Sequence, residues 1–367
     1  MSKAREIAKL GEVMTNGQIG GRRNIIINGA MNVAQRATGA TGLGASTGYF
    51  TVDRVQSGHS GNSAGRYTMT QEPITNLDGF NNALKLDCTT ADTSIASNEW
   101  EYLAYNIEAK DLQALKFGTS NAEKFTLSFF VKGNASATYT LGAYLPDSNR
   151  WMAQTFSVTT SFTRVSLTWE ADTTGTINDD NGPGLIFYIT LQVGSDRTSG
   201  SIPSTWETLA TADIADSSQT QFFDSTSRTL FITGLQMEVG SVATPFEYRS
   251  YGDELYLCQR YFEVSGTGSD NPAGWNFGGM STEVSHNTGY IPGQQFAVEK
   301  RANPTVVIYS RNGNSGKVSA FNTGSDEGNG HAINAVKKTG FHAVQRDGGS
   351  YTTGQGYEYG YTADAEL

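Results

Sequence analysis

Short strand-like runs separated by turn residues are the feature that most constrains how this chain can fold. From Asn24 to Glu238, apolar and β-branched runs alternate with clusters of Gly, Asn, Asp and Thr-Gly. This spacing is typical of a β-sandwich, in which each short strand must reverse direction to pair with another. The segments expected to form strands are 24–33, 66–71, 84–89, 99–107, 124–132, 137–145, 151–158, 162–169, 185–193 and 229–238. Strands in this number suit two packed sheets.

The composition also favours β-structure. Among 367 residues there are 42 Gly and 17 Tyr, and the sustained runs of Ala, Leu, Glu and Lys that long helices need are few. The length suits two or three domains of ordinary size. We therefore expect an all-β protein with little helix, in which residues 111–117 form at most one or two helical turns.

The stretch from Thr229 to Phe262 closes the sandwich and begins a different structure. Its first part is expected to be a strand with both faces covered, one face carrying Phe231, Thr233, Leu235 and Met237 and the other Leu230, Ile232, Gly234, Gln236 and Glu238. Thr244-Pro245 then favours an extended exit. After the acidic pair Asp253-Glu254, a short helix would gather the apolar residues Leu255, Leu257, Cys258, Tyr261 and Phe262 on one face.

The N-terminal residues show the clearest helical pattern. Ile7, Leu10 and Met14 are spaced three and four apart, and the Gly-rich residues 17–21 end the pattern. A helix of about four turns is marginal alone in water, so we expect a partner, either copies of itself or a groove on another protein. The alternative is a frayed leader peptide. The expected domains are an anchor helix and linker (1–23), a jelly-roll-like β-sandwich (24–250), a connector helix (251–262) and a second β-domain (263–367).

The second β-domain has loops that are long relative to its strands, as a displayed binding surface would have. Its expected strands are 275–280, 294–299, 304–310, 331–336, 340–345 and 355–362. The aromatic residues considered for such a surface are Trp275, Phe277, Tyr290, Tyr309, Tyr351, Tyr357, Tyr359 and Tyr361. Either these rings fill a second core, as alternating Tyr in strands usually does, or some of them form a surface site.

Two motifs resemble hydrolase sites but lack the required context. The Gly-x-Ser-x-Gly sequence at 61–65 is followed by a strand pattern, whereas a nucleophile elbow needs a helix there, so a hairpin loop is expected. Glu99 and Glu101 share one face of a strand, but a glycosidase pair must lie across a cleft at a defined separation. We therefore expect no enzymatic activity.

Metal and cofactor sites are not expected either. Residues 178–182 could offer oxygens to Ca²⁺, but the EF-hand spacing and its closing Glu are missing, so a tight turn is predicted. His59, His286, His331 and His342 show no metal-ligand spacing. Cys88 and Cys258 form no Cys-x-x-Cys motif and are expected to be buried thiols.

The charge pattern limits the possible partners. The net charge is −10, and the Lys and Arg residues are scattered, which argues against a nucleic-acid groove or a basic membrane-binding face. No apolar run is long enough for a signal peptide or a membrane span. We expect the protein to be made and assembled in the cytoplasm.

Several segments, taken in order, resemble bacteriophage tail-fibre and receptor-binding proteins. They are RRNIIINGAMNVAQR, YFTVDRV, LQALKFGT with FTLSFFVKG, ITGLQMEVG, ATPFEYRS and ELYLCQRYF, which together span most of residues 22–262. The resemblance implies a structural protein of the virion tail, a homotrimer that attaches through its N-terminus to other tail or baseplate proteins and binds host-surface polysaccharide. The strand pattern also resembles jelly-roll carbohydrate-binding modules. A glycan depolymerase and a capsid decoration protein are the two alternatives.

An anchored N-terminus would leave the opposite end of the protein free to meet a cell, so a glycan site is expected in the second β-domain. Aromatic rings stack on the apolar faces of sugars, while Asn and Gln bind the hydroxyl groups. Trp275 is the only Trp of this domain and follows a Pro-Ala-Gly loop. The residues expected to bind glycan are Trp275, Tyr290, Asn271, Asn276, Phe277 and Gln294, and those expected to attach the protein to the virion are Ile7, Leu10 and Met14.

Overall fold

The computed structural model describes residues 23–61, 63–265, 290–321, 323–327, 331–345 and 356–367. They fall into two compact units that divide between Tyr251 and Gly252, with Gln35–Ala37 belonging to the second unit and Leu367 to the first. In both units every described strand pairs antiparallel with its neighbours. The chain is therefore all-β, as its composition predicts.

The first unit holds two sheets, with strand orders β1-β4-β5-β13-β7-β10 and β12-β9-β8-β11-β6-β3-β2. The strands are β1 (Gly39–Leu43), β2 (Gly48–Tyr49), β3 (Val55–Ser60), β4 (Arg66–Pro73), β5 (Asn82–Thr90), β6 (Trp100–Glu108), β7 (Phe125–Gly133), β8 (Ala137–Leu145), β9 (Arg150–Val158), β10 (Thr163–Trp169), β11 (Pro183–Val193), β12 (Glu207–Thr208) and β13 (Thr229–Val239). Short 3-10 helices lie between them: η1 (Ala109–Leu115), η2 (Pro146–Ser148), η3 (Ser195–Arg197), η4 (Thr211–Asp213) and η5 (Phe222–Asp224).

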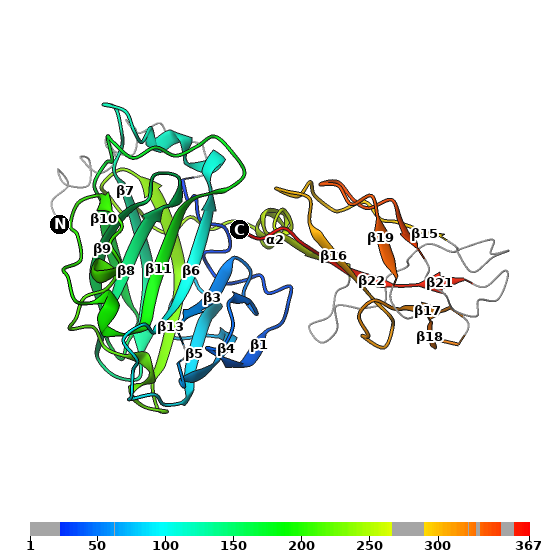
Figure 1. Ribbon diagram of the computed structural model, residues 1–367, viewed down its shortest axis with the longest axis horizontal. Coiled ribbons are helices and arrows are strands. Elements are labelled where there is room, and N and C mark those ends of the chain that lie inside the picture. Colours follow the sequence, from blue (N-terminus) through cyan, green and yellow to red (C-terminus); the bar gives the residue numbers. More distant parts are fainter. Residues whose placement is uncertain (1–22, 62, 266–289, 322, 328–330, 346–355) are drawn as a thin grey trace. The chain divides into compact units, whose positions relative to one another are not determined.

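Eight of these strands form a jelly roll. One sheet contains β5-β13-β7-β10 and the other β9-β8-β11-β6, so the chain crosses between the sheets at most steps and its last strand, β13, returns to lie between β5 and β7. Figure 1 shows β9, β8, β11, β6 and β3 side by side in the seven-stranded sheet. The jelly-roll-like sandwich predicted from the sequence is confirmed.

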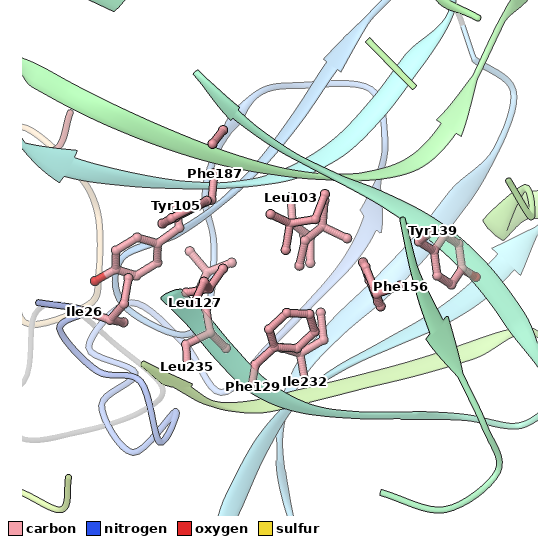
Figure 2. Close-up of a cluster of buried hydrophobic side chains, with 14 of the residues drawn as sticks. Ile26, Leu103, Tyr105, Leu127, Phe129, Tyr139, Phe156, Phe187, Ile232 and Leu235 are labelled. Carbon is pink, nitrogen blue, oxygen red and sulfur yellow. The ribbon is translucent and has the colours of Figure 1, made fainter. Parts of the chain in front are cut away.

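The core of the first unit lies between the two sheets. Figure 2 shows Leu103 and Phe187 of the seven-stranded sheet facing the same interior as Phe129 and Ile232 of the six-stranded sheet. Aromatic residues fill much of this space, and the ring of Phe125 stacks on that of Trp169 with centroids 5.3 Å apart. The alternating apolar residues from which the strands were predicted are thus the residues that fill the core.

The predicted faces of β13 are wrong, because the strand contains a bulge. Gly234 has φ +67°, and the pairing with β7 shifts between Thr233 and Gln236. This extra residue exchanges the two faces of the strand partway along it. Leu230 and Leu235 consequently both face the core, although they lie an odd number of residues apart.

The predicted strand at 24–33 is also wrong. Asn28 and Met31 have φ of 58° and 57°, in the left-handed region that no strand can use. Asn24 holds this segment against β13: its Nδ2 donates to Leu235 O at 3.0 Å, and its Oδ1 accepts from the backbone N–H groups of Ile26 and Met237. Together with two backbone bonds, from Ile25 N to Met237 O and from Leu235 N to Gly29 O, this side-chain amide attaches the segment to β13 without a continuous strand ladder.

The other predicted strands of the first unit match the observed ones within two residues at each end. The helical turns expected at 111–117 correspond to η1. A helix, α2 (Tyr251–Gln259), occupies the stretch where a connector helix is predicted. Cys88 and Cys258 are buried free thiols. Strand positions were predictable because each depends on a local pattern of apolar residues.

The described residues of the second unit form three small sheets, with strand orders β14-β22-β16, β15-β20-β19 and β18-β17-β21. Their strands are β14 (Phe262–Val264), β15 (Tyr290–Pro292), β16 (Thr305–Tyr309), β17 (Val318–Ala320), β18 (Asp326–Glu327), β19 (Ala332–Asn334), β20 (Ala343–Gln345), β21 (Tyr357–Glu358) and β22 (Gly360–Asp364). Tyr357, Tyr359 and Tyr361 are buried in the core of this unit, so for these three the core interpretation is correct. The predicted segments 304–310, 331–336, 340–345 and 355–362 each contain a strand.

The predicted strand at 294–299 is not formed. The backbone N–H of Ala297 donates to the carboxylate of Glu263 instead of to a neighbouring strand, and only Gln295 makes an isolated bridge, with Gly340. Glu263 also accepts from the buried Lys300 Nζ at 2.6 Å. A buried carboxylate thus takes the backbone donor that a strand would use. The predicted strand at 275–280 lies outside the described residues.

Asn24→Ala should destabilise the first unit by about 2–4 kcal/mol, because it leaves buried backbone groups of β13 and its neighbour without partners. Asn134→Ala is the matched control, since its Oδ1 accepts a single exposed hydrogen bond from Thr229 N. Denaturant unfolding of both variants gives the comparison. Equal, small losses for the two would show that the Asn24 amide does not hold the segment.

Candidate functional site

A cluster of aromatic rings lies on the outward face of the seven-stranded sheet. Leu103 of β6 points into the core. Side chains along a strand alternate between its two faces, so Trp100 and Tyr102, each an odd number of residues from Leu103, point outward. The aromatic face consists of Trp100, Tyr102, Tyr144 and Tyr188, all half-buried. The Trp100 ring centroid lies 4.4 Å from that of Tyr102 and 5.1 Å from that of Tyr188. The rings of Trp100, Tyr102 and Tyr188 on β6 and β11 therefore form one cluster, and Tyr144 of β8 is joined to it through Trp151, at centroid distances of 6.5 and 6.0 Å.

Small residues on the neighbouring strands let these rings lie across the sheet. Gly58 of β3 pairs directly with Tyr102, and a Cβ at Gly58 would lie 2.3 Å from the tyrosine ring. Tyr188 pairs with Ala104 on β6 and Gly142 on β8, and the space over Gly142 is filled by the ring of Trp151.

Trp151 of β9 is part of the support for this face and not of its accessible surface. Its ring rests on Gly142, where a Cβ would lie 1.9 Å away. Its Nε1 donates to Asp213 O at 3.1 Å, and Ile214 and Ala215 pack in the same cluster, so the side chain is only 2% exposed. The centroids of the Trp151 and Tyr188 rings lie 6.0 Å apart, so the buried Trp151 supports the side chain of Tyr188.

Polar groups border the aromatic face. Trp100 Nε1 donates to Thr190 Oγ1 at 3.2 Å, and Asn106 Nδ2 donates to Tyr49 OH at 2.8 Å. The half-buried amide of Gln56 forms no hydrogen bond with any residue that the structure describes. Thr190 and Asn106 are buried and bonded within the protein, so of these groups the Gln56 amide is the one available beside the rings.

The hydroxyl groups of Tyr102 and Tyr188 stay protonated at neutral pH. Burial raises the pKa of Tyr188, and the neighbouring tyrosines raise it further. Burial also raises the pKa of Tyr102. Both hydroxyl groups can therefore donate as well as accept a hydrogen bond.

Most of the residues predicted from the sequence to form a site lie outside the described part of the chain. This holds for Trp275, Asn271, Asn276 and Phe277, and equally for Ile7, Leu10 and Met14. Tyr290 begins β15 and pairs with Gln345. Gln294 is half-buried, and its backbone oxygen accepts from Phe341 N at 3.0 Å. A glycan site in the second unit stays a prediction.

The Gly-x-Ser-x-Gly motif is a loop, as the sequence predicts. Ser63 Oγ donates to Asp92 Oδ2 at 3.2 Å and accepts from Gly65 N, and strand β4 follows. Residues 178–182 form the predicted turn, in which Asp180 Oδ1 accepts from Gly182 N at 2.7 Å. Within the described ranges, no His, Cys, Asp and Glu side chains gather into a group of three that could hold a metal ion.

The carboxylates of Glu99 and Glu101 are inside the sandwich. Glu99 accepts from Ala96 N and Gln192 Nε2, whereas the oxygens of Glu101 have no hydrogen-bond partner among the described residues. Burial raises the pKa of Glu101 to about 9, and the charge of Glu99 adds to the shift. Neither group is open to a substrate in this structure, since their exposed fractions are 2% and 0%.

No protein-family model matches this chain, and no curated protein matches it in sequence. Among solved structures, the chain is similar to the enzymatically active domain of a bacteriophage CBA120 tailspike protein. The two are 10% identical over 59% of this chain, with a TM-score of 0.29. The match spans 21% of the tailspike chain, about a fifth.

Jelly-roll carbohydrate-binding modules are similar to the same extent. A family 4 module is 10% identical over 58% of this chain and 97% of its own, with a TM-score of 0.28. A family 11 module from Clostridium thermocellum, solved with a mixed-linked tetrasaccharide, is 10% identical over 57% of this chain and 99% of its own, also at 0.28. At these identities and TM-scores, the similarities establish nothing about what this chain binds.

In the described residues no helix has the length and apolar character needed to cross a membrane.

Glu101→Gln should remove a pH dependence of stability. Between pH 4.5, the usual value for Glu, and about pH 9, folded Glu101 keeps a proton that the unfolded chain has released. The contribution of protonated Glu101 to the unfolding free energy is therefore complete below pH 4.5 and is lost as pH rises through this window. The unfolding free energy falls by at most about 1.4 kcal/mol per pH unit.

The measurement is the unfolding free energy of the wild type and of Glu101→Gln from pH 5 to 9. We expect the difference between them to grow in favour of the variant as pH rises. Glu123→Gln, at an exposed carboxylate, should show no such trend. A difference that is constant across this range would contradict the assignment of a buried, neutral Glu101.

Proposed function

We propose that this protein binds glycan through the aromatic face of its first unit. The observation that carries the proposal is the cluster of half-buried rings of Trp100, Tyr102 and Tyr188 on the outward face, in which Tyr102 lies over Gly58 and meets the Tyr188 ring edge to face at 5.0 Å. A sugar ring has apolar C–H groups on its faces, which pack on an aromatic plane, and hydroxyl groups at its rim. Flat rings bordered by amides and hydroxyls are complementary to both.

The location of the proposed site differs from the one predicted from sequence. Trp275 and its neighbours in the second unit lie outside the described residues, so the two sites are separate hypotheses. The aromatic face is supported by contacts between described residues, in particular the support that Trp151 gives to Tyr188. It is therefore the site that we place first.

We propose further that the protein is a structural component of a bacteriophage tail. Support comes from the order of sequence segments that resembles tail-fibre and receptor-binding proteins. Under this proposal residues 1–23, with Ile7, Leu10 and Met14, attach the chain to other tail or baseplate proteins, and the chain assembles as a homotrimer in the host cytoplasm. A capsid position is the alternative, and labelled virions seen by electron microscopy separate the two.

Binding without hydrolysis is also part of the proposal. The two hydrolase-like motifs are used structurally, because Ser63 Oγ is bonded to Asp92 and to the backbone N–H of Gly65, and Glu101 is fully buried. Incubation with host polysaccharide followed by a reducing-end assay is the test. Release of new reducing ends would identify a depolymerase instead.

Tyr188→Ala should weaken glycan binding about fivefold or more, since an aromatic contact at an interface contributes on the order of 1 kcal/mol or more. Trp151→Ala should instead lower the unfolding free energy by about 3–5 kcal/mol, because it empties a buried site. A glycan array followed by calorimetric titration measures binding, and denaturant unfolding measures stability.

Trp275→Ala is the comparison that locates the site. Loss of binding in Tyr188→Ala with normal binding in Trp275→Ala supports the aromatic face. The reverse result, in a Tyr188→Ala protein that remains folded, would place the site in the second unit.

A further inference from the structure

A positively charged side chain lies at the edge of the aromatic face. Arg197 ends η3, directly after β11. Its Cζ lies 5.6 Å from the centroid of the Trp100 ring, and its Nη2 donates to Ser60 Oγ at 3.1 Å. The guanidinium group is therefore held beside the rings by one aromatic contact and one hydrogen bond to the end of β3.

The charge of Arg197 is not balanced within the described residues. Other arginines, such as Arg36 and Arg150, form ion pairs with carboxylates, at 3.0 and 2.6 Å. Arg197 forms no such pair in the described ranges, and its buried Nε has no hydrogen-bond partner there. In a chain with a net charge of −10, an unpaired cation on this surface is notable.

The acidic groups near Arg197 are engaged elsewhere. Asp196, the preceding residue, accepts from Ser97 Oγ at 3.1 Å. The carboxylate of Glu99 is bonded to Ala96 N and Gln192 Nε2. Around Trp100 the outward positions of the paired strands are neutral, with Ser60 on one side and Val193 on the other.

A guanidinium group with free donors binds carboxylates through short, charge-assisted hydrogen bonds. Here the donors lie next to a surface on which a sugar ring can stack. Trp100 contacts Tyr102 and Tyr188 at centroid distances of 4.4 and 5.1 Å, so a sugar on either tyrosine lies close to Arg197. A carboxylate on that sugar, or on its neighbour in the chain, would reach the guanidinium group.

We propose that the glycan bound by the aromatic face is acidic, and that Arg197 binds the carboxylate of a uronic acid residue within it. This inference rests on the proposed glycan-binding function and adds the class of ligand. It makes Arg197 the residue that distinguishes acidic from neutral polysaccharides, while the rings supply binding that both classes share.

Matched pairs of oligosaccharides test the proposal. The probes are hexamers of galacturonate, of mannuronate and of hyaluronan, each compared with its carboxyl-reduced form, which keeps the sugar chain and removes the charge. Calorimetric titration of the whole protein gives the dissociation constants. The variants are Arg197→Gln, Arg197→Lys and, as a control with the same loss of charge at an exposed position, Lys124→Gln.

We expect the wild type to bind at least one acidic hexamer more tightly than its reduced form. Arg197→Gln should weaken binding of that acid about tenfold and leave the reduced form unchanged, since a charged hydrogen bond is lost. Arg197→Lys should keep part of the preference, and Lys124→Gln all of it. Added salt should weaken binding of the acid more than that of the reduced form.

The inference is overturned if the wild type binds acidic and reduced forms equally, if it binds no acidic hexamer, or if the preference survives Arg197→Gln. Tyr188→Ala separates this failure from failure of the proposed function. If Tyr188→Ala loses neutral sugars that the wild type binds, the aromatic face is a glycan site whether or not Arg197 reads a charge. If the wild type binds no glycan of either kind, both proposals fail.

Discussion

The strand register of the seven-stranded sheet is the constraint on which the proposed site depends. It sets Gly58 opposite Tyr102 and places Tyr188 between Ala104 and Gly142. A slip of one residue would turn these rings into the core and bring apolar core residues to the surface. The aromatic face is therefore a consequence of how the core packs, because Leu103 and Phe187 on the opposite side of the same strands fix that register.

The parts of the structure that depend on local pattern could be predicted from the sequence. The central strands of the sandwich, the loop at 61–65 and the all-β class each follow from nearby residues. The faces of β13 could not be predicted, because the bulge at Gly234 depends on packing against Phe80 and Phe130. The segment at 24–33 has apolar residues typical of a strand, but its path is determined by Asn24 and Asn28, which bond to distant parts of the chain.

The aromatic face was missed for the same reason. Trp100 and Tyr102 lie two residues apart, which predicts a common face, but nothing local shows that this face points outward or that Tyr188 lies beside it. The glycines at 58 and 142 gave a signal only once their cross-strand partners were known. The sequence pattern instead favours the aromatic residues of the second unit, of which Tyr357 and Tyr361 fill a core.

The most direct test of the account is a crystal structure of the whole protein with the oligosaccharide that it binds most tightly. We expect a sugar ring stacked on Tyr102 or Tyr188, with the rest of the oligosaccharide lying across β6, β11 and β8. A sugar bound only in the second unit, with the aromatic face empty, would contradict it.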